Sequence, residues 1–168
     1  SNIGTSPESP FKTMNHALER IYSDSLNINT IHLESGIYSP STNGEVFPIQ
    51  WSNYVNLSGN GEDDTILDAD STGSVMEFRY VTESLIENIT ISNGYSSSGG
   101  GIHCSNSNPS LVNVTITGNT SSSGGGIYCS SYSSPSLMNV TITGNSASIQ
   151  GGGIYCSSYS SPSLMNVT

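Results

Sequence analysis

Residues 124–141 read GGGIYCSSYSSPSLMNVT, and residues 151–168 repeat the same letters 27 positions later. A diverged copy, GGGIHCSNSNPSLVNVT, occupies residues 99–115. A short fixed period of this kind is typical of solenoid proteins, in which each repeat forms one coil that stacks on the coil before it. The repeat therefore predicts a scaffold whose function resides in the side chains of its outer faces.

Each repeat contains three short segments in which apolar residues recur at fixed places, as they do in β-strands. The first segment covers residues 89–91, 114–116 and 140–142, the second ends at Cys104, Cys129 and Cys156, and the third surrounds Leu111, Leu137 and Leu164. Three strands per coil and about five coils predict an all-β fold, a single-stranded parallel β-helix, which the rule for parallel crossovers makes right-handed.

The chain divides into three parts in this interpretation. Residues 1–29 form an N-terminal helical cap, residues 30–83 form irregular β-helix coils, and residues 84–168 form regular tandem repeats of 25–27 residues. The apolar pattern of residues 9–22 predicts a short capping α-helix, because the spacing of Met14, Leu18 and Ile21 places them on one face of a helix. Such a helix would cover the open end of the first coil.

The cap and the irregular coils carry further local signals. Pro10 or Thr13 is expected to begin the helix, since proline suits a first turn and threonine can cap it. Gly36 is expected to turn the chain after the first strand. The expected strands of the irregular coils cover residues 31–33, 46–49, 54–57, 65–67 and 75–78.

The charges are few and unevenly placed. The chain has 168 residues and a net charge of −10, from 13 acidic and 3 basic residues. This balance argues against binding to nucleic acid or to an anionic membrane surface, because both require basic patches. Every Asp, Glu, Lys and Arg lies between Glu8 and Glu87, so only His103 can titrate near neutral pH in the repeats.

The composition favours a secreted or cell-surface protein, because Ser, Thr, Asn and Gly dominate the repeats and charge is low. No apolar stretch approaches the roughly 20 residues that a membrane span needs. The chain starts at Ser1 without Met and stops within a repeat at Thr168. We therefore expect a piece of a longer protein, whose uncapped C-terminal coil is a candidate for end-to-end self-association.

Two parts of the sequence resemble known families. The segments PFKTMNHAL (residues 10–18), IHLESGIY (31–38) and VNLSGNGEDDTILDAD (55–70) resemble bacterial secreted right-handed β-helix proteins of the pectate-lyase-like superfamily. The segment ITGNSASIQGGGIYC (142–156) is similar to the repeats of chlamydial polymorphic outer membrane proteins. The resemblance implies the fold but no single activity, because the superfamily includes lyases, hydrolases and adhesins.

Two apolar ladders are expected inside the coils. In Ile-Tyr-Cys, strand alternation places isoleucine and cysteine on the inner face and tyrosine on the outer face. The expected ladders consist of Ile102, Ile127 and Ile154, and of Cys104, Cys129 and Cys156. Metal binding, disulfides and a nucleophilic thiol are the alternatives for the cysteines, but no Cys-x-x-Cys pair exists. Packed free thiols are the favoured interpretation, because cysteine is readily buried.

Asparagine recurs at two corners of the coil. Asn113, Asn139 and Asn166 form one series, which Asn88 begins, and Asn93, Asn119 and Asn145 form the other. Stacked amides can hydrogen-bond along such a column. Several also match the glycosylation pattern Asn-x-Ser/Thr, namely Asn56, Asn88, Asn113, Asn119, Asn139 and Asn166. The structural role is the favoured interpretation.

Two outward columns are candidates for ligand contact. Tyr128 and Tyr155 are expected to stack on one outer face, with His103 one coil earlier, and Tyr132 and Tyr159 repeat at a corner. Such aromatic residues can bind sugar rings or protein, or simply stack between coils. Thr90, Thr115, Thr117, Thr141 and Thr143 form the second column. Threonine suits an exposed strand, and a Thr-x-Thr column is also a pattern of ice-binding solenoids.

Acidic residues are the remaining candidates for chemistry. Glu62, Asp63, Asp64, Asp68 and Asp70 form a cluster in the irregular coils. Asp68 and Asp70 would share a strand face and are the candidate calcium ligands. Polysaccharide cleavage would need paired carboxylates or a basic residue, and Arg79 is the one base beyond the cap. We expect no catalytic residues and no cofactor within this chain.

The sequence thus favours a non-catalytic extracellular scaffold with a structural, adhesive or filament-forming role. A module that binds or cleaves carbohydrate is the first alternative, with a glycan as its partner. An ice-binding solenoid is the second alternative. Membrane insertion is not expected within these residues.

Overall fold

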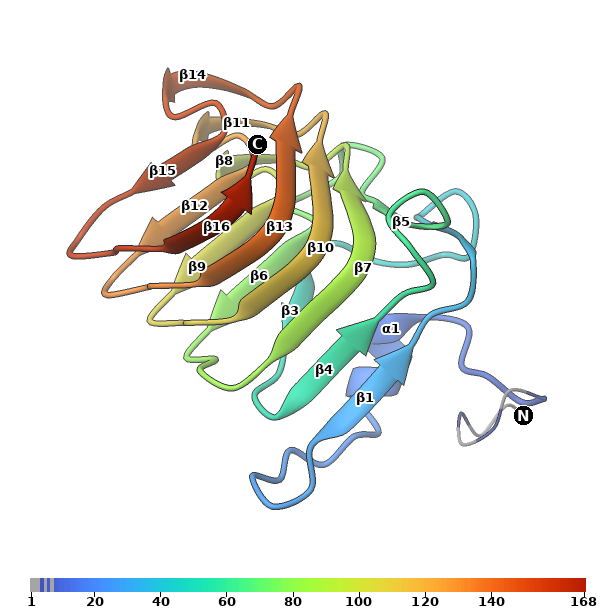
Figure 1. Cartoon of the computed structure of the whole chain (residues 1–168). Coiled ribbons are helices and arrows are strands. Elements are labelled where there is room, and N and C mark those ends of the chain that lie inside the picture. The colour runs from blue at the N-terminus through green and yellow to red at the C-terminus, as the bar shows by residue number, and fades with distance from the viewer. Residues whose placement is uncertain (1–3, 5, 7) are drawn as a thin grey trace.

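The chain winds into a parallel β-solenoid of about five turns, shown in Figure 1 as a computed structural model that describes residues 4, 6 and 8–168. Three parallel sheets run along its length. In Figure 1 the nearer strands run upward and the farther strands return while the chain advances to the left, so the coil is right-handed. The predicted fold class is therefore confirmed.

Sheet A forms the near face in Figure 1 and is the largest of the three sheets. It contains β1 (Asn29–His32), β2 (Gly36–Tyr38), β4 (Val55–Ser58), β5 (Thr65–Asp68), β7 (Leu85–Ser92), β10 (Ser110–Thr117), β13 (Ser136–Thr143) and β16 (Ser163–Val167). The Leu-centred and Val-Thr-Ile segments of the repeats, which we expected to be separate, are single strands here. They bend at Asn113 and Asn139, whose φ angles are 51° and 54°.

Two smaller sheets complete the coil. Sheet B contains β3 (Ile49–Trp51), β6 (Met76–Arg79), β9 (Ile102–Ser105), β12 (Ile127–Ser130) and β15 (Ile154–Cys156). Sheet C contains β8 (Tyr95–Ser98), β11 (Thr120–Ser123) and β14 (Ser146–Gln150). Sheet C was missed from the sequence, because its serine-rich strands lack the apolar alternation that marks the others.

The helical cap is shorter than predicted. The helix α1 covers Met14–Leu18 rather than residues 9–22, and the Thr13 side chain accepts a hydrogen bond from the His16 N–H. The Glu45 carboxylate accepts a second one, from the Met14 N–H at 2.7 Å. A helix this short depends on tertiary contacts rather than on its own propensity. It packs against β3 and contributes Met14 to the core.

Two expectations for the irregular coils are wrong. The strand expected at residues 46–49 begins only at Ile49, because Pro48 has no N–H to donate to a neighbouring strand. Gly36 begins β2 instead of ending the preceding strand. The division into a cap, irregular coils and regular repeats at residues 29 and 83 remains our proposal.

The core is one continuous column of apolar side chains along the solenoid axis. Strand register stacks like on like: Ile127 pairs with Ile102 and Ile154, and Leu137 pairs with Leu111 and Leu164. The predicted ladder of Ile102, Ile127 and Ile154 is therefore present, and Cys129 likewise pairs with Cys104 and Cys156. Among the described residues no helix is long and apolar enough to cross a membrane.

Candidate functional site

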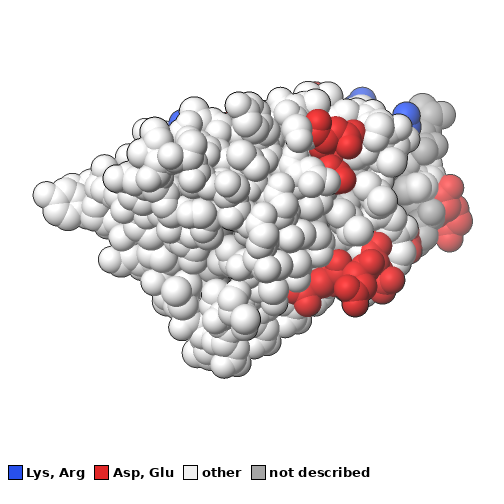
Figure 2. Space-filling model, turned by 90° about the horizontal axis from the view of Figure 1, so that it is seen from above, with Lys and Arg blue, Asp and Glu red and all other residues white. Residues whose placement is uncertain are grey.

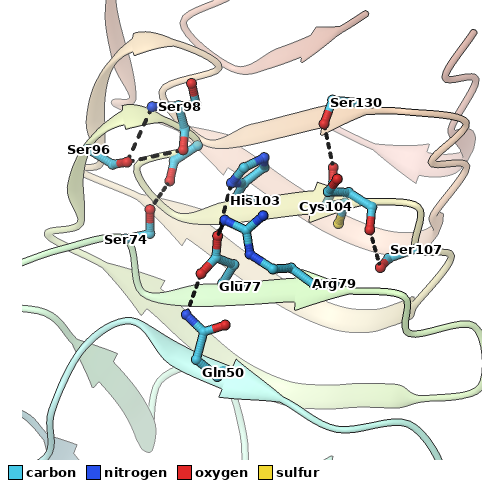
Figure 3. Close-up of polar contacts among 12 residues, drawn as sticks. Gln50, Ser74, Glu77, Arg79, Ser96, Ser98, His103, Cys104, Ser107 and Ser130 are labelled. Carbon is cyan, nitrogen blue, oxygen red and sulfur yellow. Dashed lines mark hydrogen bonds and ion pairs between the residues drawn. The ribbon is translucent and has the colours of Figure 1, made fainter. Parts of the chain in front are cut away.

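The outer face of sheet B carries a column of polar and aromatic side chains, to which each strand contributes one member. Strand register places Gln50, Glu77, His103, Tyr128 and Tyr155 next to one another in that order. We call these five residues the sheet B column. Figure 3 shows the first three on successive strands, with Arg79 beside Glu77. The column is a consequence of strand alternation, because Met76, Ile102 and Ile127 point into the core.

Glu77 is the centre of this column. Its carboxylate accepts hydrogen bonds from the Gln50 amide and from the Arg79 guanidinium. The His103 Nδ1 atom lies 3.3 Å from Glu77 Oε1 (Figure 3). Charge-assisted bonds of this kind are stronger than bonds between neutral groups. They hold Glu77 and His103 in a fixed mutual orientation.

The environment lowers the pKa of both groups. Burial raises the pKa of Glu77, but the hydrogen bonds from Gln50 and Arg79 and the charge of Arg79 outweigh it, so the net shift is downward. Burial lowers the pKa of His103, and the charge of Glu77 offsets only part of that effect. His103 is therefore neutral at pH 7. With its proton on Nδ1 toward Glu77, its Nε2 atom is a hydrogen-bond acceptor.

Replacing Glu77 with glutamine is expected to lower the pKa of His103 further. The substitution removes the negative charge that favours the imidazolium form, while burial and Arg79 continue to disfavour it. An NMR titration of the His103 imidazole signals would measure the change. The control variant Glu87→Gln alters a carboxylate on sheet A. A pKa that rises in Glu77→Gln, or that falls equally in both variants, would show that Glu77 is not the counter-charge.

A groove adjoins the sheet B column beside sheet C. Its volume is about 340 Å³, and its lining includes Glu77, Arg79, His103 and Tyr95 together with serine side chains. Tyr95 is exposed, and the serines are Ser74, Ser96, Ser97 and Ser98. Hydroxyl groups, a guanidinium and an imidazole acceptor around an open hollow can bind a ligand that carries several hydroxyls.

The predicted tyrosine columns are both present, but their ring faces contact each other. The rings of Tyr128 and Tyr155 lie 5.5 Å apart at 34°, and those of Tyr132 and Tyr159 lie 5.4 Å apart at 11°. The rings of Tyr128 and His103 also make an edge-to-face contact, with their centroids 5.2 Å apart. Stacking between coils therefore occupies one of the two faces of each ring that a sugar could use. The outer edges of the rings remain accessible to a ligand.

The expected outward threonine column is partly covered. Thr90 is buried, and its hydroxyl donates to the Glu62 carbonyl at 2.7 Å. Thr115 donates to the Glu62 carboxylate at 3.0 Å. The irregular turn between β4 and β5 lies over these positions, so Thr90 faces outward from its sheet but is covered by the turn and is not exposed. Only Thr117, Thr141 and Thr143 remain partly or fully exposed without that cover.

The two candidate calcium ligands do not share a strand face. β5 ends at Asp68, and Asp70 lies in the following turn with a φ of 48°. Asp68 accepts hydrogen bonds from the Asp70 N–H and the Asn93 amide, and Asp70 accepts one from the Ser41 N–H. These contacts order the turn. The described residues contain no group of three or more His, Cys, Asp or Glu side chains that could hold a metal ion.

The cysteine ladder consists of free thiols. Cys129 pairs in register with Cys104 and Cys156. Cys104 and Cys129 are buried. The contact with Cys104, together with burial, raises the pKa of Cys129. Burial raises the pKa of Cys156 to about 11. The Cys129 and Cys156 thiols are therefore protonated at neutral pH, which is consistent with a packing role.

The asparagine ladder forms a hydrogen-bonded column. Asn113 donates to the Asn88 amide oxygen at 3.0 Å, Asn139 donates to Asn113 at 3.1 Å, and Asn166 donates to Asn139 at 3.1 Å. All four residues have positive φ angles, which asparagine tolerates better than most residues. The ladder thus satisfies the corner geometry and links each coil to the next.

Sequence reasoning missed the partners that make the sheet B column a site. Glu77, Gln50 and Tyr95 were not among the predicted residues, although Arg79 and His103 were noticed separately. One sequence pattern could have revealed that Glu77 lies beside His103. Met76-Glu77-Phe78-Arg79 has the same alternation of inward and outward residues as Ile102-His103-Cys104-Ser105. The alignment of these two segments is hard to recognise in the sequence, because the repeats of the earlier coils have diverged.

Family comparisons agree with this architecture. Residues 1–80 match the family described as "Protein of unknown function (DUF1565)". Residues 113–130 and 139–157 match the repeat described as "Chlamydia polymorphic membrane protein (Chlamydia_PMP) repeat". The chain is a parallel β-helix protein with repeats of the polymorphic membrane protein type. The two resemblances inferred from the sequence are thereby confirmed.

One solved structure shows the likeness of this β-helix protein to a larger one. It is a mutant pectin methylesterase in complex with a hexasaccharide, with a TM-score of 0.55 and 12% sequence identity. The alignment covers 85% of this chain and 52% of that enzyme, so the chain spans about half the enzyme's length. At this identity the likeness shows the fold alone. No curated protein sequence matches the chain.

Proposed function

We propose that the chain is a non-catalytic β-solenoid scaffold that is secreted or displayed at the cell surface and has a structural, adhesive or filament-forming role. The observation that carries the proposal is the amide ladder from Asn88 to Asn166, in which equivalent residues of successive coils hydrogen-bond directly. Such a column can be lengthened by further repeats without any new kind of contact. The match to a membrane protein repeat supports the surface location.

Labelling of intact cells tests the surface location. Antibodies against residues 84–168 are expected to bind intact cells of the source organism, and protease added outside the cells is expected to remove the signal. A cytosolic protein serves as the control for leakage. Labelling that appears only after permeabilisation would contradict the proposal.

Self-association through the C-terminal coil is part of this proposal. Leu164 is 56% exposed there, whereas Leu137, at the same place in the preceding repeat, is 1% exposed. A second copy that stacks on this coil would cover the same kind of surface. Light scattering over a concentration series tests the contact, and a monodisperse monomer at high concentration would argue against it.

The second candidate function is carbohydrate binding, which the groove beside the sheet B column specifically favours. Arg79 and His103 supply a donor and an acceptor, and Tyr95 supplies an exposed aromatic ring. Tyr128 and Tyr155 continue the same face and would contact a longer glycan with their edges. The similar fold of a protein with a bound hexasaccharide supports this candidate.

Calorimetric titration with a panel of hexasaccharides is expected to show binding that the groove residues control. Arg79→Ala or His103→Ala should weaken it by about tenfold, which corresponds to roughly 1.4 kcal/mol, because each removes a polar contact. Arg20→Ala removes a cation that does not line the groove and serves as the control. Equal affinities of all three variants would place any binding elsewhere.

A further inference from the structure

Two tyrosines at one corner of the solenoid form an exposed stacked pair. Tyr132 follows β12 and Tyr159 follows β15, at the same place in two identical repeats. Their rings lie 5.4 Å apart and are nearly parallel, at 11°. Tyr132 is 67% exposed and Tyr159 is 83% exposed. Both phenol rings are therefore open to solvent while they remain in contact with each other.

The backbone holds this pair in an unfavourable conformation. The φ angles of Tyr132 and Tyr159 are 63° and 62°, and the preceding residues Ser131 and Ser158 also have positive φ. The left-handed region costs a residue with a β-carbon roughly 1–2 kcal/mol. The Tyr132 N–H donates to the Ser158 carbonyl at 2.9 Å, which ties the two corners together. Strain of this kind is a reason to look for a role of the exposed rings.

The other pair of stacked tyrosines, Tyr128 and Tyr155, differs from the corner pair in solvent exposure and in ring orientation. Tyr128 and Tyr155 are half-buried and tilted by 34°, and the Tyr128 hydroxyl lies 3.3 Å from the Ser157 hydroxyl. Tyr128 also has a ring contact with His103. The corner pair is thus the one that combines parallel stacking with high exposure among the described tyrosine pairs.

We propose that Tyr132 and Tyr159 are a modification site for oxidative coupling to dityrosine, with hydrogen peroxide and a peroxidase as the oxidant. Each phenol loses one electron and its hydroxyl proton to give a tyrosyl radical. The radicals join by a carbon–carbon bond between ring carbons ortho to the oxygens, and the hydrogen on each of these carbons moves to the oxygen. The two electrons and two protons reduce one hydrogen peroxide to two waters.

The cross-link would staple one coil covalently to the next. The two residues are 27 positions apart, so the bond closes a loop of one full coil and restricts the unfolded chain. The exact repeat would allow the staple to recur wherever the corner tyrosine recurs. Its occurrence in the organism rests on the proposed extracellular location, where peroxide and peroxidases act, whereas the chemistry itself can be tested on the purified chain.

Treatment of the dilute chain with peroxidase and hydrogen peroxide is expected to produce dityrosine fluorescence in the monomer. Intact mass should fall by two hydrogens. The peptides around the two tyrosines have identical sequences, so variants must assign the bond. Tyr132→Phe and Tyr159→Phe should each reduce the monomer fluorescence to that of a blank without peroxide, while the double variant Tyr128→Phe, Tyr155→Phe should retain it.

Three outcomes would overturn the proposal. They are fluorescence that persists in Tyr132→Phe and Tyr159→Phe, loss of fluorescence in the Tyr128 and Tyr155 double variant, and coupling that occurs only between molecules and vanishes on dilution. Circular dichroism confirms that each phenylalanine variant is folded, and the dilution series on the unmodified sequence needs no variant. Failure of coupling would leave the surface-labelling result untouched, so the two proposals fail separately.

Discussion

Replacing Leu137 with alanine is expected to lower the free energy of unfolding of the 168-residue chain by about 2–5 kcal/mol, as is usual for a buried leucine. Leu137 is 1% exposed and lies between Leu111 and Leu164 in the inner column. Its truncation leaves a cavity that the rigid stack cannot close. Since whole domains have stabilities of only about 5–15 kcal/mol, the loss is a large fraction of the total. Chemical denaturation measures it.

The exact repeat supplies a matched control for this substitution. Leu164 has the same neighbours in sequence as Leu137 but is 56% exposed. Leu164→Ala is therefore expected to cost much less than Leu137→Ala, because less apolar surface is returned to water. Equal losses in the two variants would mean that the coils are not packed as described, or that Leu164 is covered in solution by a second copy, which light scattering would reveal.

Replacing Gly125 with alanine is expected to be about as damaging, with a loss of about 3 kcal/mol from overpacking. A β-carbon at Gly125 would lie 2.4 Å from the carbonyl oxygens of Gly152 and Ser146 in the next coil. These are backbone atoms, so relief requires the coils to move apart. That movement would break the hydrogen bond from Gly125 to Gly151, which is 3.0 Å long. The thermal midpoint of unfolding reports the loss.

Gly152 provides the corresponding control. It occupies the same place in the next repeat, but a β-carbon there would come no closer than 3.2 Å, to the Asn145 carbonyl. Gly152→Ala is therefore expected to be tolerated with a small loss. If Gly125→Ala were as stable as Gly152→Ala, the close approach of the two glycine segments would not exist in solution.

The acidic residues are unevenly distributed over the surface of the molecule. Acidic side chains gather at the end of the molecule that carries the irregular coils, and the repeat end is almost free of charge (Figure 2). Arg79 and Glu77 therefore lie where the charged coils meet the neutral repeats. This position is why the groove beside the sheet B column has both ionic and hydroxyl groups in its lining.

The tandem repeat was enough to predict the fold and its ladders. Ile and Cys recur every 25–27 residues, which admits one arrangement in which like residues meet, and the register of β9, β12 and β15 has that arrangement. Strand alternation then separated inward Cys129 from outward Tyr128. These are local or periodic properties, so no knowledge of distant contacts was needed to infer them.

Other features depended on contacts between segments that no period connects. The burial of Thr90 depends on the path of the turn that contains Glu62, and the end of β5 at Asp68 depends on the chain turning toward Asn93. The contact between Glu77 and His103 forms because a coil with a diverged sequence packs beside a regular repeat. In each case, which residues come into contact depends on how the irregular coils pack against the rest of the chain. Residue spacing in the sequence does not determine that packing.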